Sequence, residues 1–184
     1  MKCAFLALSL ILTANVAAAC ELHKNAAAHE ATAVTTTIPD VKVITQDGRT
    51  VDFYSDLVKG KVVAVNFVFT SCSTVCPAMG AIFGKLQEQH ADAHLVSVSI
   101  DPEVDTPAKL KAWSRKFGAK PGWTLVTGKK DDITRLLKAL NAYSGDYVNH
   151  QPVTLLGNDA TGTWKRSYGF TSATKLAAML EELQ

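Results

Sequence analysis

Three short apolar runs each predict a β-strand with both faces buried. They occupy residues 61–70, 94–100 and 123–128 and read KVVAVNFVFT, HLVSVSI and WTLVTG. In the first run, apolar and β-branched residues are almost continuous, which is typical of a central strand in a parallel sheet. Amphipathic stretches with helical spacing lie between the runs. The pattern therefore predicts a chain in which strands alternate with helices.

Four amphipathic stretches predict helices. Pro77 opens the first of them, because proline fits the first turn of a helix, where its missing N–H costs nothing. The second has Thr106 as its cap, Pro107 in its first turn and Gly118 after its end. The third is also expected to be capped. The four stretches span residues 77–90, 105–118, 131–143 and 172–184.

Two further segments predict β-hairpins. Residues 41–53 alternate on both sides of Asp47-Gly48, a dipeptide that favours a left-handed turn. Residues 152–157 and 163–169 flank a glycine-containing loop. Alternating strands and helices imply an α/β fold with a parallel core sheet covered on both faces. The order of elements suits a thioredoxin-like fold with an added N-terminal β-hairpin and a C-terminal hairpin before the last helix.

The N-terminal region predicts export. Residues 1–19 read as a signal peptide, with a basic start at Lys2, an apolar core and a run of small residues before Cys20. The alternative is a retained N-terminal anchor. The apolar stretch is short for a membrane span, which argues against that alternative. Cys20 stands where a bacterial lipoprotein signal has its lipidated cysteine, although Ala17 occupies the position where such signals usually have leucine. Lipidation at Cys20 and simple cleavage both remain open.

Composition limits the classes of partner. Residues 20–37 are rich in Ala and Thr without periodicity and predict a flexible tether, so residues 38–184 form one domain. The formal net charge is +2 and no basic run occurs, which argues against a nucleic-acid partner. Export would place the cysteines in a compartment where a disulfide can persist.

Cys72 and Cys76 follow the first apolar run, where the carboxyl end of a strand and the start of a helix predict a site. Three interpretations are open. A structural disulfide is one, although a bridge across so small a loop constrains little of the unfolded chain. Reversible thiol–disulfide exchange is the second, because Cys76 lies near a helix N-terminus that stabilises thiolates. A soft metal site for Cu(I) or Zn(II) is the third.

A metal site would need a further ligand, and histidine is the expected type. His23 and His29 lie in the tether and are expected to be solvated, and His90 and His94 are expected at the surface, on no shared helix face. His150 precedes a predicted strand whose entry runs beside the cysteine turn in thioredoxin-like folds. By sequence alone it is either a surface residue or a ligand. Met79 is more typical of core packing than of a thioether ligand.

Three segments together resemble the motifs of the Sco (SenC) family of copper proteins. They read GKVVAVNFVFTSCSTVCP, VSIDPEVDTP and YVNH, and the resemblance extends from about Pro39 to Leu183. It implies a thioredoxin-like fold with Cys72, Cys76 and His150 as copper ligands. The implied role is assembly of the binuclear copper centre of cytochrome c oxidase, carried by subunit II or another copper-site protein. The protein would act as a copper donor, as a thiol reductant of the oxidase cysteines with a possible reductant partner, or as both.

The sequence departs from the family pattern at two places near the predicted ligands. Ser73-Thr74 replaces the usual Pro-Asp after the first cysteine, and Asn149 replaces the usual Asp before the histidine. Fewer acids are expected to lower the pKa of the thiols and to make the disulfide more oxidising. An exported thiol–disulfide oxidoreductase without a physiological copper role is therefore the alternative.

A peroxidase and an inert domain with a structural bridge are two further alternatives. The segment STVCP resembles a peroxiredoxin turn, but Phe69 occupies the place of that motif's proline.

Overall fold

Strand β4 (Val62–Val68) lies at the centre of the sheet, as its apolar run predicts. It is parallel to β5 (His94–Ser99) on one side and antiparallel to β7 (Val153–Asn158) on the other. Its side chains are buried at six of seven positions, which explains the continuous apolar sequence. The chain therefore places the end of β4 in the middle of the fold, where the cysteine segment begins.

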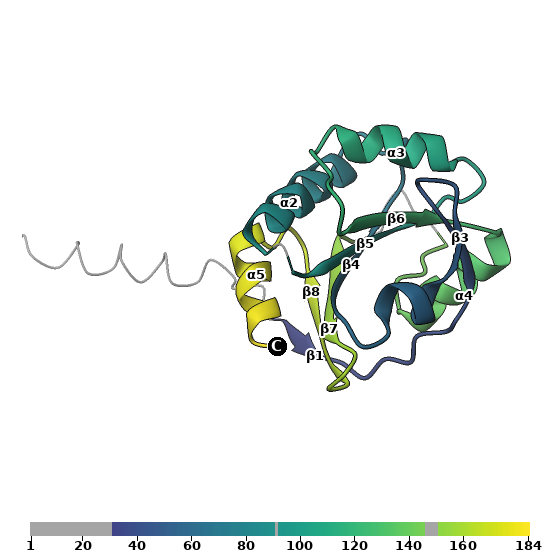
Figure 1. The fold of residues 1–184 in the computed structure, drawn as a ribbon. Helices are drawn as coiled ribbons and strands as arrows, with labels where there is room; N and C mark the ends of the chain where they lie inside the picture. The colour runs from purple at the N-terminus through teal and green to yellow at the C-terminus, as the bar shows by residue number, and fades with distance from the viewer. Residues whose placement is uncertain (1–30, 91, 146–150) are drawn as a thin grey trace, which may run out of the picture. The chain divides into compact units, whose positions relative to one another are not determined.

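The computed structural model describes residues 31–90, 92–145 and 151–184. Within these residues, eight strands form one mixed sheet in the order β1-β8-β7-β4-β5-β6-β2-β3 (Figure 1). The parallel part is β4-β5-β6, and the other pairs are antiparallel. The remaining strands are β1 (Thr32–Ala33), β2 (Lys42–Thr45), β3 (Thr50–Asp52), β6 (Trp123–Thr127) and β8 (Thr163–Tyr168).

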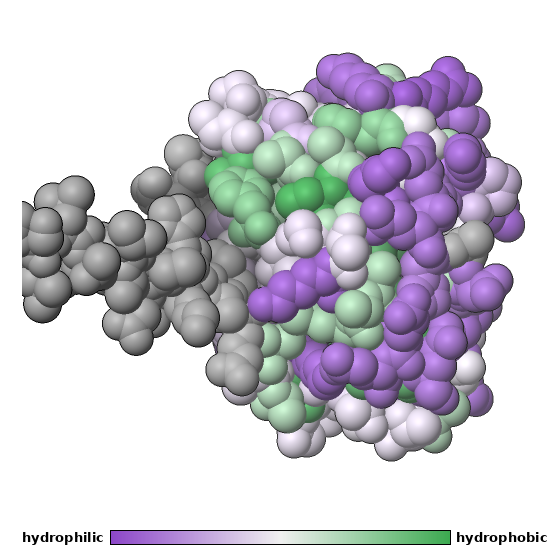
Figure 2. Space-filling model, turned by 90° about the vertical axis from the view of Figure 1, so that its left-hand side faces the viewer, coloured by the Kyte–Doolittle hydropathy of each residue, from purple (hydrophilic) through white to green (hydrophobic). Residues whose placement is uncertain are grey.

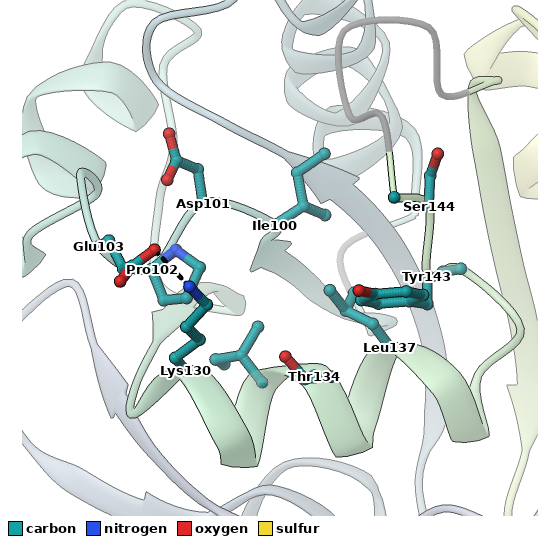
Figure 3. Close-up of a pocket in the computed structure, with 12 residues that line it drawn as sticks. Ile100, Asp101, Pro102, Glu103, Lys130, Thr134, Leu137, Tyr143 and Ser144 are labelled. Carbon is teal, nitrogen blue, oxygen red and sulfur yellow. Dashed lines mark hydrogen bonds and ion pairs between the residues drawn. The ribbon is translucent and has the colours of Figure 1, made fainter.

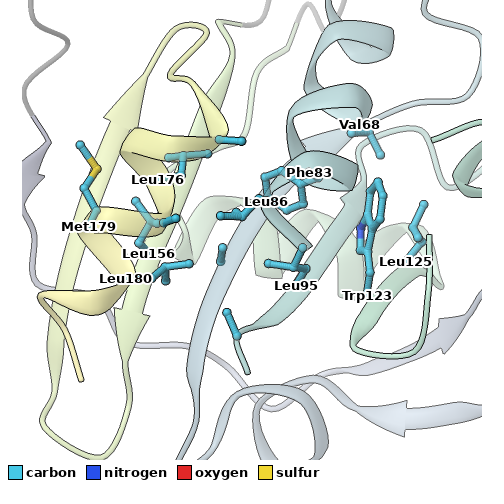
Figure 4. Close-up of a cluster of buried hydrophobic side chains, with 14 of the residues drawn as sticks. Val68, Phe83, Leu86, Leu95, Trp123, Leu125, Leu156, Leu176, Met179 and Leu180 are labelled. Atoms are coloured by element: carbon cyan, nitrogen blue, oxygen red, sulfur yellow. The ribbon is translucent and has the colours of Figure 1, made fainter. Parts of the chain in front are cut away.

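Helices cover both faces of the sheet and enclose two apolar clusters. The first cluster lies under α2 (Val75–Gln89), α3 (Pro107–Arg115) and α5 (Ala173–Glu181), and Figure 4 shows its leucines between helices and strands. The second lies on the other face, under α4 (Lys130–Ala139) and the π-helical turn η1 (Phe53–Val58). The predicted α/β architecture with both faces covered is confirmed.

The helix starts agree with the sequence in two cases and differ in two. Thr106 and Ser172 cap α3 and α5 through side-chain oxygens that accept hydrogen bonds from backbone N–H groups. Helix α2 begins at Val75, before the expected Pro77. The predicted cap of α4 is wrong, because its N-cap residue is a lysine whose side chain makes no cap hydrogen bond. Two aspartates in the first turn face the positive end of the helix dipole instead.

Both predicted hairpins are confirmed. β2 and β3 pair antiparallel, and Gly48 in their turn has a φ of 78°, a conformation that glycine adopts without steric cost. β7 and β8 pair antiparallel over six residues, with Gly162 at a φ of 68° in the loop between them. In this hairpin Gly157 lies under the Trp164 ring, where an added Cβ would come within 2.0 Å of it.

Strand β1 extends the sheet beyond the predicted hairpin. Thr32 pairs with Arg166 and Ala33 with Lys165, and the Val34 N–H donates to the Trp164 carbonyl at 3.0 Å. These residues belong to the segment expected to be a tether. The pairing uses backbone groups on the side of β8 that faces away from β7, so the side-chain pattern of this segment gave no sign of it.

Helix α2 packs closely against the end of α3. A Cβ added to Gly84 would come within 2.3 Å of the Phe117 carbonyl oxygen, and one added to Gly80 within 2.5 Å of the Phe117 ring. Two small residues one turn apart on α2 therefore allow this approach. The contact fixes the position of α2, the helix that carries Cys76 in its first turn.

The surface carries apolar and polar side chains in separate areas of the face that Figure 2 shows. None of the helices in the described part of the chain is long and apolar enough to cross a membrane.

Candidate thiol and metal site

The two cysteines lie at the turn from β4 into α2. The strand ends at Val68 and the helix begins at Val75, so Cys72 is in the turn and Cys76 is the second residue of the helix. The Cys72 N–H donates to the Phe69 carbonyl at 3.2 Å, which tightens the turn. The site thus forms at the carboxyl edge of the parallel strands, where α/β folds place their sites.

The turn brings the two residues into direct contact. The backbone N–H of Cys76 donates to the Cys72 sulfur across 3.4 Å. The Thr74 hydroxyl lies 3.9 Å from the same sulfur, although Thr74 is the N-cap of α2 and does not cap it with its side chain. Both cysteines are free thiols. Cys72 is partly exposed, whereas Cys76 has no exposed surface.

The pKa values of the two thiols are shifted in opposite directions. Burial raises the pKa of Cys72, but hydrogen bonds from Cys76 and Thr74 outweigh it and lower the pKa overall. Burial also raises the pKa of Cys76, here to about 12, and the neighbouring Cys72 and Asp105 add to this increase. The expectation that both thiols would be acidic is therefore confirmed for Cys72 and wrong for Cys76. Cys76 points into the core, where desolvation opposes the charged form more than the helix N-terminus favours it.

Asp105 is a site residue that the sequence analysis missed. Its carboxylate is 1% exposed and accepts hydrogen bonds from the Thr70 N–H at 3.1 Å, the Thr70 hydroxyl at 2.5 Å and the Ser99 hydroxyl at 2.7 Å. It thereby joins the end of β5 to the turn that carries Cys72. Two of the family's usual acids are absent from this sequence, but Asp105 supplies negative charge near the sulfurs from another loop. Two features of the sequence could have pointed to Asp105, which lies in the motif VSIDPEVDTP and directly before the Thr106 cap.

The predicted third ligand, His150, lies outside the described residues, and its role stays a prediction. His90 and His94 are on separate elements, as expected, because His90 ends α2 and His94 begins β5. His94 is exposed, but the expected surface position of His90 is wrong. His90 is 8% exposed because it closes the end of α2, where its N–H donates to the Leu86 carbonyl.

Within residues 31–90, 92–145 and 151–184, no three His, Cys, Asp or Glu side chains form a metal-binding group. The thiol pair therefore has no third ligand of these types among the residues that the structure describes. Met79 is 2% exposed in α2, as expected for core packing.

A hollow of about 240 Å³ lies at the same edge of the sheet (Figure 3). It is bounded by Ile100 and Asp101 after β5, by one face of α4 and by Tyr143, whose side chain is largely exposed. Burial raises the pKa of Asp101, and the charges of Asp105 and Glu103 raise it further. Glu103 also forms an ion pair of 2.8 Å with Lys130 across the rim. The surface beyond the carboxyl end of β5 is therefore concave, with Tyr143 on one side and charged side chains on the other.

The fold and the turn define an α/β protein with paired thiols at a strand-to-helix junction of the thioredoxin type. The sequence model of the SCO1/SenC family matches residues 29–183, and the chain belongs to that family. The resemblance noted from the three motifs is thus confirmed over the whole described domain.

Two curated relatives show the extent of the sequence similarity. The SCO1 protein homolog of Bacillus subtilis is 36% identical over 88 residues, which is 45% of each chain. A protein of Stutzerimonas stutzeri whose name refers to copper binding is 31% identical over 138 residues, 67% of this chain and 66% of that one. The chain therefore spans about half to two thirds of the length of these relatives.

Solved structures confirm the fold. The SCO1/SenC family lipoprotein of Bacillus anthracis has a TM-score of 0.70 at 30% identity, covering 83% of this chain and 97% of that chain. BsSco, described as a member of the Sco family of cytochrome c oxidase assembly proteins with a disulfide switch, has a TM-score of 0.70 at 28% identity, covering 83% and 95%. The predicted thioredoxin-like Sco fold is thus the fold of this chain.

Proposed function

We propose that this protein binds one copper ion through Cys72, Cys76 and His150 and serves the assembly of a copper centre of the cytochrome c oxidase type. The contact between the Cys76 N–H and the Cys72 sulfur at 3.4 Å carries the proposal, because it gathers two thiols in one turn. The name of the S. stutzeri relative and the description of BsSco support the same role. The partner would be subunit II of the oxidase or another copper-site protein.

The donor set fits copper. Two thiolate sulfurs are soft ligands that suit Cu(I), and an imidazole nitrogen adds the borderline donor that Cu(II) requires. Copper would supply the charge that compensates two thiolates held close together. Because the pKa of Cys76 is about 12, this thiol must lose a proton when the metal binds. Copper affinity is therefore expected to rise with pH.

Metal titration tests the ligands. The reduced full chain is titrated with Cu(I) against a competing chelator, and uptake close to one equivalent is expected. Cys72→Ser and Cys76→Ser should each abolish this uptake, whereas the exposed Ser73→Ala serves as the control and should leave it unchanged. Uptake that survives both cysteine variants would place the copper elsewhere and reject the proposal.

A histidine variant tests the third ligand. His150→Ala should weaken Cu(II) binding much more than Cu(I) binding, because two thiolates satisfy Cu(I). The matched control is His94→Ala, an exposed histidine at the start of β5. Equal Cu(II) affinity in wild type and His150→Ala would remove His150 from the site and with it the main support for a Sco-type copper site.

Thiol–disulfide exchange is a second candidate function. It is favoured by the lowered pKa of Cys72 and the raised pKa of Cys76. The Cys72 thiolate would attack a disulfide of the partner, forming a mixed disulfide and releasing one partner thiolate. Cys76, after losing its proton, would attack the Cys72 sulfur and release the second partner thiolate. Two electrons thus pass to the partner and a Cys72–Cys76 disulfide forms. Alkylation and mass spectrometry before and after mild oxidation test this, and thiols that stay alkylatable under every oxidant contradict it.

We also propose that the protein is exported to the periplasmic side of the membrane and tethered there through lipidated Cys20. The signal-like pattern of residues 1–19 and the similarity to a family lipoprotein of B. anthracis support this location. Metabolic labelling with a fatty acid should mark the wild type and spare Cys20→Ala. Label that persists in Cys20→Ala would contradict tethering at this residue.

A further inference from the structure

A second hollow, of about 390 Å³, lies at the edge of the sheet opposite the thiols. It is found between the β2–β3 turn, the end of α3 and the segment that enters β6. Because β4, β5 and β6 are parallel, the amino end of β6 is remote from the carboxyl edge that carries Cys72. A ligand in this hollow would leave the thiol turn accessible. Its function is therefore separate from the proposed copper site.

The charged residues that line this hollow are mostly cations. Arg49, Lys111, Arg115 and Lys120 all face it, and Asp47 is the one acid among the residues that line it. Lys111 forms an ion pair of 2.8 Å with Asp47. In the part of the chain that the structure describes, Arg49, Arg115 and Lys120 form no direct ion pair with an acid. The hollow thus has more positive charge than its own residues neutralise.

Asp47 shows that an anion is stabilised at this place. The hydrogen bond from Lys111 lowers the pKa of its carboxyl group, and although burial opposes this, the charges of Lys111, Arg49 and Arg115 lower it further. Two guanidinium groups and one ammonium group therefore act on the same point. Asp47 is exposed and stands in a hairpin turn, so it occupies only part of the hollow.

The backbone around the hollow is held firmly by two glutamine side chains. Gln46 accepts a hydrogen bond from the Leu125 N–H at 2.8 Å and donates to the Trp123 carbonyl at 3.3 Å. Gln87, which is 8% exposed, accepts from the Lys120 N–H at 2.9 Å and donates to the Lys120 and Pro121 carbonyls at 3.0 Å. The cations therefore project from a frame that is in place before any ligand arrives.

We propose that this hollow is a binding site for a phosphate-bearing anion, held mainly by Arg49 and Arg115. Guanidinium groups present paired N–H donors that match the oxygens of a phosphate group. The volume is at the lower end of the range for small-ligand sites, and the polar lining suits a charged group. The phosphate group belongs either to a small soluble compound or to a lipid headgroup. These sources share one chemistry, and the experiment separates them.

Nuclear magnetic resonance of the ¹⁵N-labelled full chain provides the first test. Inorganic phosphate is added at constant ionic strength, and the amides of residues 46–49, 120 and 122–124 should shift with saturation. Arg49→Gln and Arg115→Gln should each weaken the interaction about three-fold or more. The matched control is Lys116→Gln, which removes a neighbouring charge outside the hollow. Equal weakening in Arg115→Gln and Lys116→Gln would show that only the net charge of the protein matters, and it would overturn the proposed site.

A change in the opposite direction sharpens the test. Asp47→Asn removes the internal anion while asparagine still suits the hairpin turn, so phosphate should bind more tightly in this variant. Weaker or equal binding contradicts the proposal.

Vesicles of phosphatidylglycerol and of phosphatidylcholine form the second arm of the test. Saturable shifts with inorganic phosphate indicate a soluble ligand, and Arg49-dependent binding to phosphatidylglycerol vesicles alone indicates a lipid headgroup. An absence of both responses rejects the proposal, whatever the outcome of the copper titrations.

Discussion

The two edges of the parallel strands use charge in opposite ways. At the carboxyl edge, Asp105 is buried and accepts hydrogen bonds from the neutral donors of Thr70 and Ser99. At the other edge, Asp47 is exposed and is paired with Lys111 among further cations. A buried charge fixes the backbone around it and strongly changes the acidity of its neighbours, whereas exposed charges are screened by water and salt. Reactivity is therefore expected at the first edge and reversible ion binding at the second.

Thiol alkylation should show the largest effect of burial at the carboxyl edge. In the reduced protein at about pH 8, Cys72 should react on the order of a hundred-fold faster than Cys76, because the thiolate fraction of Cys72 is much larger than that of Cys76. The opposite pKa shifts of the two thiols give the direction. Mass spectrometry of peptides after timed alkylation measures both rates. Similar rates for the two cysteines would show that the core does not protect Cys76.

A matched pair of substitutions compares the two aspartates directly. Asp105→Asn should lower the free energy of unfolding by about 2 kcal/mol or more, because the donors of Thr70 and Ser99 lose part of their buried acceptor. Asp47→Asn should lower it by less than about 1 kcal/mol, as expected for an exposed ion pair. Denaturant unfolding of both variants measures the difference. Equal losses would remove the distinction between the buried and the exposed edge.

The same Asp105 variant should change the acidity of Cys76. The negative charge of Asp105 contributes to the raised pKa of this thiol, so Asp105→Asn should bring that pKa down. The pH profile of Cys76 alkylation measures the change. The profile of Cys76 should stay the same in Asp47→Asn, which serves as the control.

The raised pKa of Cys76 should also make the stability of the fold depend on pH in the alkaline range. Burial and charge raise the pKa of Cys76 from an ordinary thiol value of 9.0 to about 12 in the folded protein. The stabilisation is therefore complete below pH 9 and is lost as the pH rises towards 12, at about 1.4 kcal/mol per pH unit. Unfolding curves at several pH values give this slope. Cys76→Ala should remove this part of the slope, and an unchanged slope in that variant would assign the loss to other groups.

The hydrogen bonds from Thr70 and Ser99 to Asp105 illustrate what local sequence could not predict. The apolar runs identified β4, β5 and β6, because strands buried on both faces leave a continuous pattern. The Asp47-Gly48 dipeptide likewise predicted its hairpin from local backbone preference. Asp105, however, lies 35 residues from Thr70 in the chain, and no local pattern relates them. Their contact exists only because β4 and β5 lie side by side.

The sequence by itself determined the core strands, the two hairpins, the four α-helices, the position of the cysteine pair and the family, because these depend on periodicity, turn residues and motifs with fixed spacing. Tertiary structure alone decided that Cys72 is acidic and Cys76 is not, since burial and hydrogen bonding to the sulfurs arise from packing. It also decided that β1 pairs with β8 and that four cations line one hollow together with Asp47. These features depend on distances between segments far apart in the chain, which residue patterns do not contain.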